Sequence, residues 1–341
     1  MTQSIAHQFY TWISVQVILT QEDELPQDNF YLKKSAFHNR YAHIYGNLDL
    51  EITEYDLAKS NCDLALLQQN TPQTTARIYL EMSKALLSKG YVTKNTEQKV
   101  ELYIEAEKTC TLSSELLSDL EMCEQDFRLW EHRICLMLHK TIYISSVDLQ
   151  IRYLEDTYRT CEGILRLWDH RLSKEFSALF CLRYSEALNL SGRLARSDGV
   201  KFFQSAIDIA TRGIKACEAE EKNRDLKSHL RFARMQSLFN LAIMQILLFF
   251  RERETVNESK KRIEDIKQNL VQAKNENEWL ALFMRDPTSP IMHSRELLQK
   301  VRKDIDAKIV ELSGMEKLID RPWYLEKPWI ARTGSYKPHF N

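Results

Sequence analysis

The chain has 341 residues, of which 44 % are hydrophobic, and its 47 Lys and Arg residues nearly balance its 48 Asp and Glu residues. This balance argues against a general nucleic-acid-binding protein or a membrane-surface protein. Only eight glycines and seven prolines interrupt the chain, which favours long helices over a fold with many turns.

The N-terminal segment, residues 1–28, has no Lys or Arg ahead of its apolar stretch. A secretory signal begins with such a basic region, so we expect none here. Ile13, Val15, Val17 and Leu19 alternate with other residues, a pattern that fits a short strand or a helix.

Residues 29–277 are expected to form an array of antiparallel helical hairpins. The apolar period is near 3.6, and capping signals such as the Thr71-Pro72 pair mark helix starts. The expected pairs are 29–45 with 49–69, 72–90 with 95–119, 122–144 with 147–162, 164–191 with 200–220, and 223–251 with 255–277.

A closing helix is expected within residues 278–314, ending at Gly314. It and the preceding helix carry apolar residues at a 3-4 spacing, which predicts a closing antiparallel hairpin. The alternative for such a stripe is an intermolecular coiled coil, so a homo-oligomer is possible. The stripe residues are Val256, Ile263, Ile266, Leu270 and Ala273 in one helix, and Leu298, Val301, Ile305 and Leu312 in the other.

Two further features concern location. The longest apolar run, Leu238 to Phe250, has 13 residues, too few for a helix that spans a bilayer, and it predicts a buried helix. The seven cysteines include no C-x-x-C pair, and an odd number cannot all pair internally. We therefore expect a cytoplasmic protein without a membrane span, most of its cysteines being buried.

A short stretch occurs twice, RLWEHR at 128–133 and RLWDHR at 166–171, thirty-eight positions apart. In the longer comparison of 123–134 with 161–172, seven of twelve residues are identical. A period of this length is typical of helical repeat arrays, in which each hairpin buries its apolar face against the next.

On a helix, the tryptophan of each copy, Trp130 and Trp168, would face the core. Arg133 and Arg171 follow three residues later, so each could stack on its indole. These four residues are therefore interpreted as structural parts of a repeat.

The stretch Asp126-Phe127-x-x-Trp130-x-x-Arg133-x-x-Leu136 resembles the Asn-Tyr-x-x-Trp-x-x-Arg-x-x-Leu repeat of protein prenyltransferase α subunits, and Leu165-x-x-Trp168-x-x-Arg171 is a shorter match. The resemblance implies a right-handed stack of antiparallel helical hairpins, similar to tetratricopeptide repeats. Gln125 and Gly163 stand where that family has its functional lysine, so the resemblance implies the architecture rather than the activity.

Small and large residues alternate in the same manner at Ser185 to Leu188, Gly192 and Ala206. Outside residues 1–28, no stretch has the alternation and regular turns of strands. The predicted fold class is therefore all-α, a tetratricopeptide-like α-solenoid.

Common catalytic and cofactor motifs are not found in the sequence. His132 and His170 each follow an acidic residue, but they recur at the repeat spacing instead of converging on a pocket. We interpret them as polar residues on outward helix faces or between repeats. Metal-ligand spacings, a Walker A loop and G-x-G-x-x-G are missing, so we expect a non-enzymatic protein with no catalytic residue, metal site or cofactor.

Two regions are candidates for partner binding. Arg224, Lys227, Arg231 and Arg234 recur at 3-4-3 spacing and form a basic stripe on one helix face. That stripe is either a solvated face or a site for an acidic peptide or a phosphate backbone.

The other candidate is the tail, residues 315–341, where prolines disfavour a helix and aromatic residues are frequent. We expect an extended segment that caps the repeat array or occupies the groove of a partner. Its candidate contact residues are Trp323, Tyr324, Trp329 and Arg332.

Together these features predict a protein-interaction scaffold or adaptor that binds a partner peptide or helix on its helical surface. One alternative is a partner-dependent enzyme subunit of the prenyltransferase α type. Another is nucleic-acid binding through the basic stripe, which we consider less well supported because the net charge is near zero.

Overall fold

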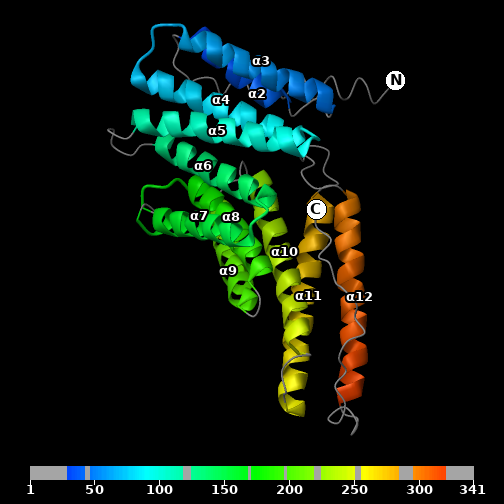
Figure 1. The fold of residues 1–341 in the computed structure, drawn as a ribbon. Coiled ribbons are helices and arrows are strands. Elements are labelled where there is room, and N and C mark those ends of the chain that lie inside the picture. Colours follow the sequence, from blue (N-terminus) through cyan, green and yellow to red (C-terminus); the bar gives the residue numbers. More distant parts are fainter. Residues whose placement is uncertain are drawn as a thin grey trace. The chain divides into compact units, whose positions relative to one another are not determined.

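A computed structural model describes residues 29–42, 47–117, 124–167, 170–195, 198–218, 224–249, 255–283 and 295–319. Within these ranges the regular secondary structure is helical and contains no strand, so the predicted all-α class is confirmed. The chain divides into two compact units, residues 1–153 and 154–341, a boundary that the sequence did not predict. Each unit is a stack of packed helices (Figure 1).

The described part of the first unit contains five complete helices and the start of a sixth. The helix starts follow the capping signals: the side chain of Asn47 caps one helix, and Thr71 caps the next, with Pro72 in its first turn. The helices are α2 (Phe30–Ala42), α3 (Leu48–Leu66), α4 (Pro72–Val92), α5 (Thr96–Leu117) and α6 (Glu124–Tyr143), and α7 (Val147–Leu167) crosses the boundary between the units.

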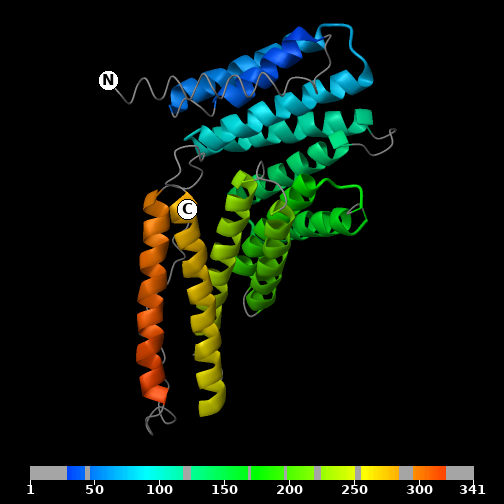
Figure 2. The ribbon, with the colours of Figure 1, turned by 180° about the vertical axis from the view of Figure 1, so that it is seen from behind.

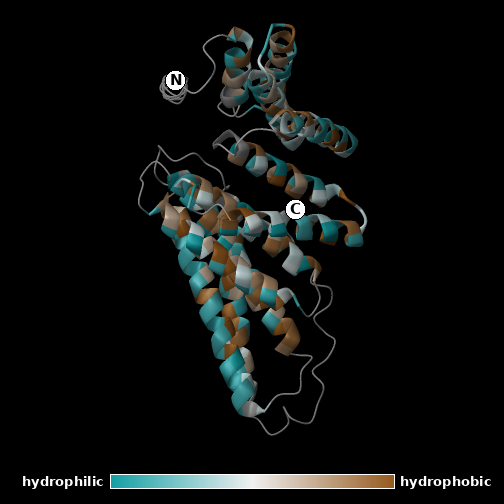
Figure 3. Cartoon of the chain, turned by 90° about the vertical axis from the view of Figure 1, so that its left-hand side faces the viewer, coloured by the Kyte–Doolittle hydropathy of each residue, from teal (hydrophilic) through white to brown (hydrophobic). Residues whose placement is uncertain are grey.

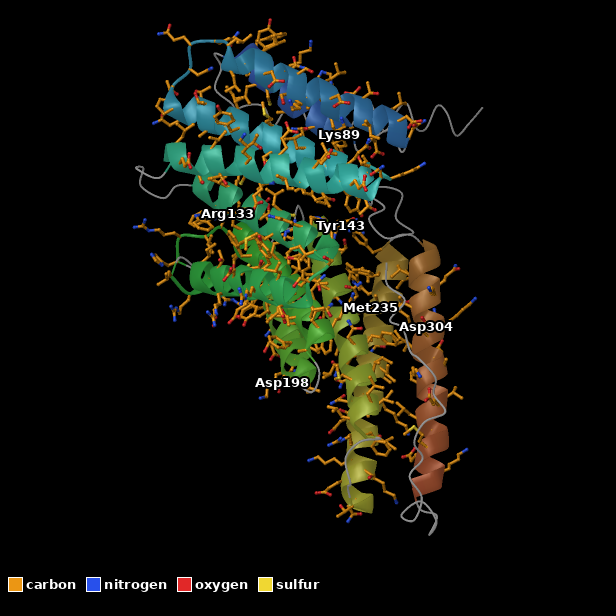
Figure 4. All side chains as sticks on the ribbon, viewed as in Figure 1. Lys89, Arg133, Tyr143, Asp198, Met235 and Asp304 are labelled. Atoms are coloured by element: carbon orange, nitrogen blue, oxygen red, sulfur yellow. The ribbon has the colours of Figure 1, made fainter. Side chains whose placement is uncertain are left out.

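Contacts between α2 and α3 show that the first pair is antiparallel. Ser35 and Cys62 are hydrogen-bonded side by side, and the Nδ1 atom of His38 lies 2.6 Å from a carboxylate oxygen of Glu54. On the α4 side, Lys89 donates to Asp56 at 2.5 Å (Lys89 is labelled in Figure 4). The core beneath them is formed by residues from α2 to α6, including Leu32, Ala65, Ile78, Ala106 and Leu136.

The second unit contains the remaining helices, and its last three lie side by side along their lengths (Figures 1 and 2). Most of its core residues come from α10, α11 and α12, including Met235 of α10, which is labelled in Figure 4. Along these helices hydrophobic and hydrophilic residues alternate, as amphipathic helices require (Figure 3). The helices are α8 (Lys174–Leu194), α9 (Gly199–Cys217), α10 (Arg224–Phe249), α11 (Val256–Phe283) and α12 (Arg295–Ile319).

The closing antiparallel hairpin of α11 and α12 is confirmed. Lys274 of α11 pairs with Asp306 of α12 at 2.7 Å, and Lys267, earlier in α11, pairs with Glu316, later in α12. The two helices therefore run in opposite directions. Eight of the nine apolar stripe residues are buried within the fold and the side chain of Val256 is not described, so a homo-oligomer stays a prediction. The buried stripe residues are Ile263, Ile266, Leu270, Ala273, Leu298, Val301, Ile305 and Leu312.

Several predicted helix ends are wrong, and α11, which was expected to end at residue 277, continues to Phe283. α12 continues through Gly314 to Ile319, because a single glycine costs a helix only about 1 kcal/mol and does not end it. The helix expected to begin at residue 164 begins at Lys174, where the side chain of Ser173 accepts a hydrogen bond from the Phe176 amide. α7 instead continues to Leu167, because Ile164 and Leu165 extend its buried face.

α10 contains the most apolar segment of the described chain. Leu226–Phe249 is long and apolar enough to cross a membrane, the single described helix of which this is true, and half of its most apolar 18-residue stretch is buried within the fold. Leu230, Met235 and Leu238 are each at most 1 % exposed. A core helix of a folded domain meets the same length and composition test, so this helix is weak evidence for a membrane span.

Two helix pairs, α4 with α5 and α8 with α9, are built alike. The Ser83 hydroxyl donates to the carbonyl oxygen of Ala106 at 2.6 Å, and the Ser185 hydroxyl donates to that of Ala206 at 3.0 Å. α4 and α8 each have 21 residues, and matching positions lie 102 residues apart.

The shared positions of α4 and α8 are those that face the neighbouring helix. Their N-caps correspond as well: the Thr71 side chain accepts from the Thr74 amide as that of Ser173 does from Phe176. Six of the 21 positions are identical, and all six are buried in both helices. The identical residues in α4 are Ala76, Leu80, Ser83, Ala85, Leu86 and Gly90.

Candidate functional site

The predicted basic stripe lies on the first three turns of α10, and α11 runs antiparallel beside it. Arg231 donates to one carboxylate oxygen of Glu276 at 2.7 Å, and Arg234 donates to the other at 2.9 Å. The Glu276 side chain is only 7 % exposed. Both arginines are therefore held by a buried acid of the same unit.

Aromatic residues of α11 hold the outer part of this cluster. The guanidinium of Arg231 lies 4.4 Å from the centre of the Trp279 ring, and Trp279 stacks on Phe283 at 5.2 Å. Arg224 lies 4.9 Å from the centre of the Phe283 ring. Two stacked rings of α11 thus lie between two guanidinium groups of α10, an arrangement that cation–π attraction stabilises.

Most residues of the basic stripe already have contacts within the second unit. Arg224, Arg231 and Arg234 contact α11, and Lys227 is half-buried. A phosphate ligand would have to compete with Glu276 for the guanidinium groups, at the cost of leaving a buried carboxylate without its partners. Partner binding by this stripe stays a prediction.

The repeated hexapeptide is not a structural repeat. RLWEHR lies in the first half of α6, where Trp130 is half-buried and the guanidinium of Arg133 lies 5.5 Å from its ring centre (Arg133 is labelled in Figure 4). RLWDHR instead spans the end of α7 and the turn that follows it, where Arg171 is exposed. Trp168 lies outside the described residues. The two copies therefore do not share a helix face.

His132 is buried and not on an outward face, but it does bridge two helices. It is 4 % exposed, and its Nε2 atom lies 2.9 Å from the Ser83 hydroxyl of α4. That hydroxyl has one proton, which it donates to the Ala106 carbonyl, so the histidine must donate its Nε2 proton to Ser83. A nucleophilic serine requires the opposite direction. The pair is therefore a structural contact.

The described cysteines and possible metal ligands show no reactive arrangement. Cys62, Cys110, Cys135, Cys161, Cys181 and Cys217 are all buried thiols. Burial raises the pKa of Cys62 to about 12 and that of Cys110 to about 11, which leaves both as unreactive thiols near neutral pH. Among the described residues no group of three or more His, Cys, Asp or Glu side chains could hold a metal ion.

A row of exposed leucines on α3 was missed by the sequence analysis. Leu50, Leu57 and Leu64 are 46, 42 and 43 % exposed and lie seven residues apart. The opposite side of α3 is buried, with Tyr55 and Cys62 at most 1 % exposed. The signal in the sequence was the seven-residue spacing of these leucines.

Other predicted site residues cannot be placed. Trp323, Tyr324, Trp329 and Arg332 lie outside the described residues, as does the alternating stretch of Ile13 to Leu19. Their assignment to partner binding, or to a strand or helix, stays a prediction.

The fold and these contacts define the class of the protein as an all-helical chain of packed antiparallel hairpins. No known family model and no curated protein matches the sequence.

Proposed function

We propose that the chain is a non-enzymatic, cytoplasmic interaction scaffold that binds a peptide or helix of a partner protein on the surface of its helical hairpins. The observation that carries this proposal is the shared construction of α4 with α5 and of α8 with α9. Proteins built from repeated hairpins use their extended helix surfaces for binding.

The contacts of the polar residues support a role without catalysis. Ser83 and His132 satisfy each other inside the first unit, and Glu276 is neutralised by two arginines inside the second. Groups arranged in this way stabilise helix packing, whereas catalytic groups must be able to reach a substrate.

The finer resemblances are part of the proposal. In the two similar hairpins a serine and a glycine of the first helix face an alanine and an aromatic ring of the second helix. These residues are Ser83, Gly90, Ala106 and Tyr103 in one hairpin, and Ser185, Gly192, Ala206 and Phe203 in the other. Such packing of small against large residues suits a tetratricopeptide-like hairpin. The stacking of Arg133 on Trp130 suits the prenyltransferase α repeat, but Gln125 replaces the lysine of that family. An enzyme subunit of that type would need a second chain to complete a diphosphate-binding site, so catalytic activity should appear only when that chain is present.

Nucleic-acid binding through α10 is the less favoured alternative, because Arg231 and Arg234 already pair with Glu276. It predicts an affinity for duplex or single-stranded nucleic acid that falls steeply as salt increases.

The experiment that tests the scaffold is affinity purification from the native cell extract, comparing the full chain with a chain that stops after Ile319. This position keeps α12 complete, including the buried Leu312 and the Lys267–Glu316 pair. A partner retained by the full chain and lost on truncation makes the tail a recognition motif. A partner gained on truncation makes the tail a cap. If both forms are recovered without a partner, the proposal fails.

A further inference from the structure

The leucine row of α3, defined as Leu50, Leu57 and Leu64, is an apolar helix face that no described element covers. Leu67, which follows the helix, is 83 % exposed and extends the row at one end. α2 and α4 pack on the other sides of α3 through Cys62 and Asp56. The row therefore lies on the outward side of the first hairpin.

The chain that precedes α2 is chemically suited to cover this face. Residues 1–21 contain no Asp, Glu, Lys or Arg, so docking of this segment would bury no charged side chain. If it is helical, the apolar residues Ile5, Phe9, Trp12 and Ile13 share one side, because they are spaced by three and four. The polar residues Ser4, His7, Gln8 and Thr11 share the other side, so the amphipathic pattern holds over residues 4–13.

The distances allow the segment to reach the row. α2 begins at Phe30 and runs antiparallel to α3, with Ser35 beside Cys62, so the preceding chain enters near the Leu64 end of the row. The row itself, from Leu50 to Leu64, is about 21 Å long at the helical rise. The fifteen connecting residues 14–28 can span up to about 50 Å.

We propose that residues 4–13 dock as an amphipathic helix on the leucine row of α3, with Phe9 and Trp12 against the leucines. The proposal holds whether or not the chain acts as a scaffold. Any partner that binds this face would have to displace the segment first, which makes the segment an internal competitor.

Two other occupants fit the observations less well. In a second copy, the acids Asp49, Asp56 and Asp63, which directly precede the three leucines, would meet their counterparts. A membrane surface would normally be met by Lys or Arg on the polar side of the segment, and residues 1–21 have neither.

The test uses a fluorescent bimane attached to Ser60→Cys, an exposed position on α3 beside the row. Because the described cysteines are buried, the label reacts selectively with the introduced thiol once Cys123, whose position is not described, is replaced by serine. Tryptophan quenches bimane on contact, so Trp12→Phe in the full chain should raise the emission at least about two-fold if most molecules are docked.

The matched control has the same label at Lys94→Cys, an exposed position between α4 and α5, where Trp12→Phe should change nothing. Leu57→Asp should also raise the emission at Ser60→Cys, because it places a charge in the row. The result must not depend on protein concentration. No gain with Trp12→Phe overturns the proposal, and a gain seen only at high concentration overturns it in favour of a second copy.

Discussion

Gly90 of α4 lies against the ring of Tyr103 of α5 so closely that an added Cβ atom would be 2.5 Å from Tyr103 Cε1. The corresponding pair in the second unit, Gly192 and Phe203, has the same relationship, with a distance of 2.7 Å. In both hairpins the hydrogen bond from serine to alanine and the contact between glycine and ring hold the two helices at short range. The absence of a side chain is thus a packing requirement at these positions.

Gly90→Ala and Gly192→Ala should each lower the free energy of unfolding by about 1 to 3 kcal/mol, because a buried ring must move to admit the methyl group. Urea titration measures this change. Gly163→Ala in α7 is the matched control, because a Cβ atom there meets nothing within 4 Å. It should gain up to about 1 kcal/mol from helix propensity. Equal stabilities of all three variants would refute this account of the packing.

Glu276→Ala should destabilise the second unit by about 3 to 5 kcal/mol, because it leaves Arg231 and Arg234 without their buried counter-charge. Glu278→Ala, two residues away on α11, removes an exposed partner of Arg302 and should cost about 0 to 1 kcal/mol. Thermal and urea unfolding of both variants compare these costs. A similar small loss for both would mean that the buried cluster contributes little.

His229 should make the stability depend on pH. Burial and the nearby charge of Arg183 lower its pKa from 6.5 to about 4. Between these values the unfolded chain takes up a proton that the folded chain does not, so stability is complete above about pH 6.5 and falls as the pH decreases toward 4. The loss amounts to roughly 2 to 3 kcal/mol.

His229→Gln should remove that part of the dependence, so urea titrations of it and of the wild type at pH 7 and pH 4.5 isolate the contribution. His170→Gln, at an exposed turn position, serves as the control. If the wild type and His229→Gln lose the same stability on acidification, the burial of a neutral His229 is contradicted.

The buried thiols should react slowly while the protein is folded. With the pKa of Cys62 raised to about 12 and that of Cys110 to about 11, almost no thiolate is present at pH 8. In a Cys123→Ser variant, a coloured thiol reagent should modify the six described cysteines only after denaturant is added. Rapid modification of Cys62 or Cys110 in the native protein would show that these sites open.

Local signals in the sequence predicted most of the helices but not their contacts. Thr71-Pro72 placed the start of α4 correctly because capping is a property of neighbouring residues. The Glu276 cluster could not be foreseen, since Arg231 lies 45 residues away and only the α10–α11 packing joins them. His132 was expected either on an outward face or between repeats, because its helix face could not be oriented without knowledge of α4.

The repeated hexapeptide also shows that a local sequence match does not determine where the residues lie in the fold. The identical letters of RLWEHR and RLWDHR predicted a structural repeat, yet one copy lies within α6 and the other at the end of α7. The hairpins that are alike share only six of 21 residues in α4 and α8. Those residues are small or apolar and buried, and packing preserves such positions without preserving conspicuous motifs.

The most direct test of the scaffold is the molar mass of the chain purified gently from its own cell extract, measured by size-exclusion chromatography with light scattering and native mass spectrometry. The account predicts a complex that contains the 40.2 kDa chain and at least one different polypeptide. A mass of 40.2 kDa alone, or only multiples of it, would contradict the claim that the chain binds a protein partner.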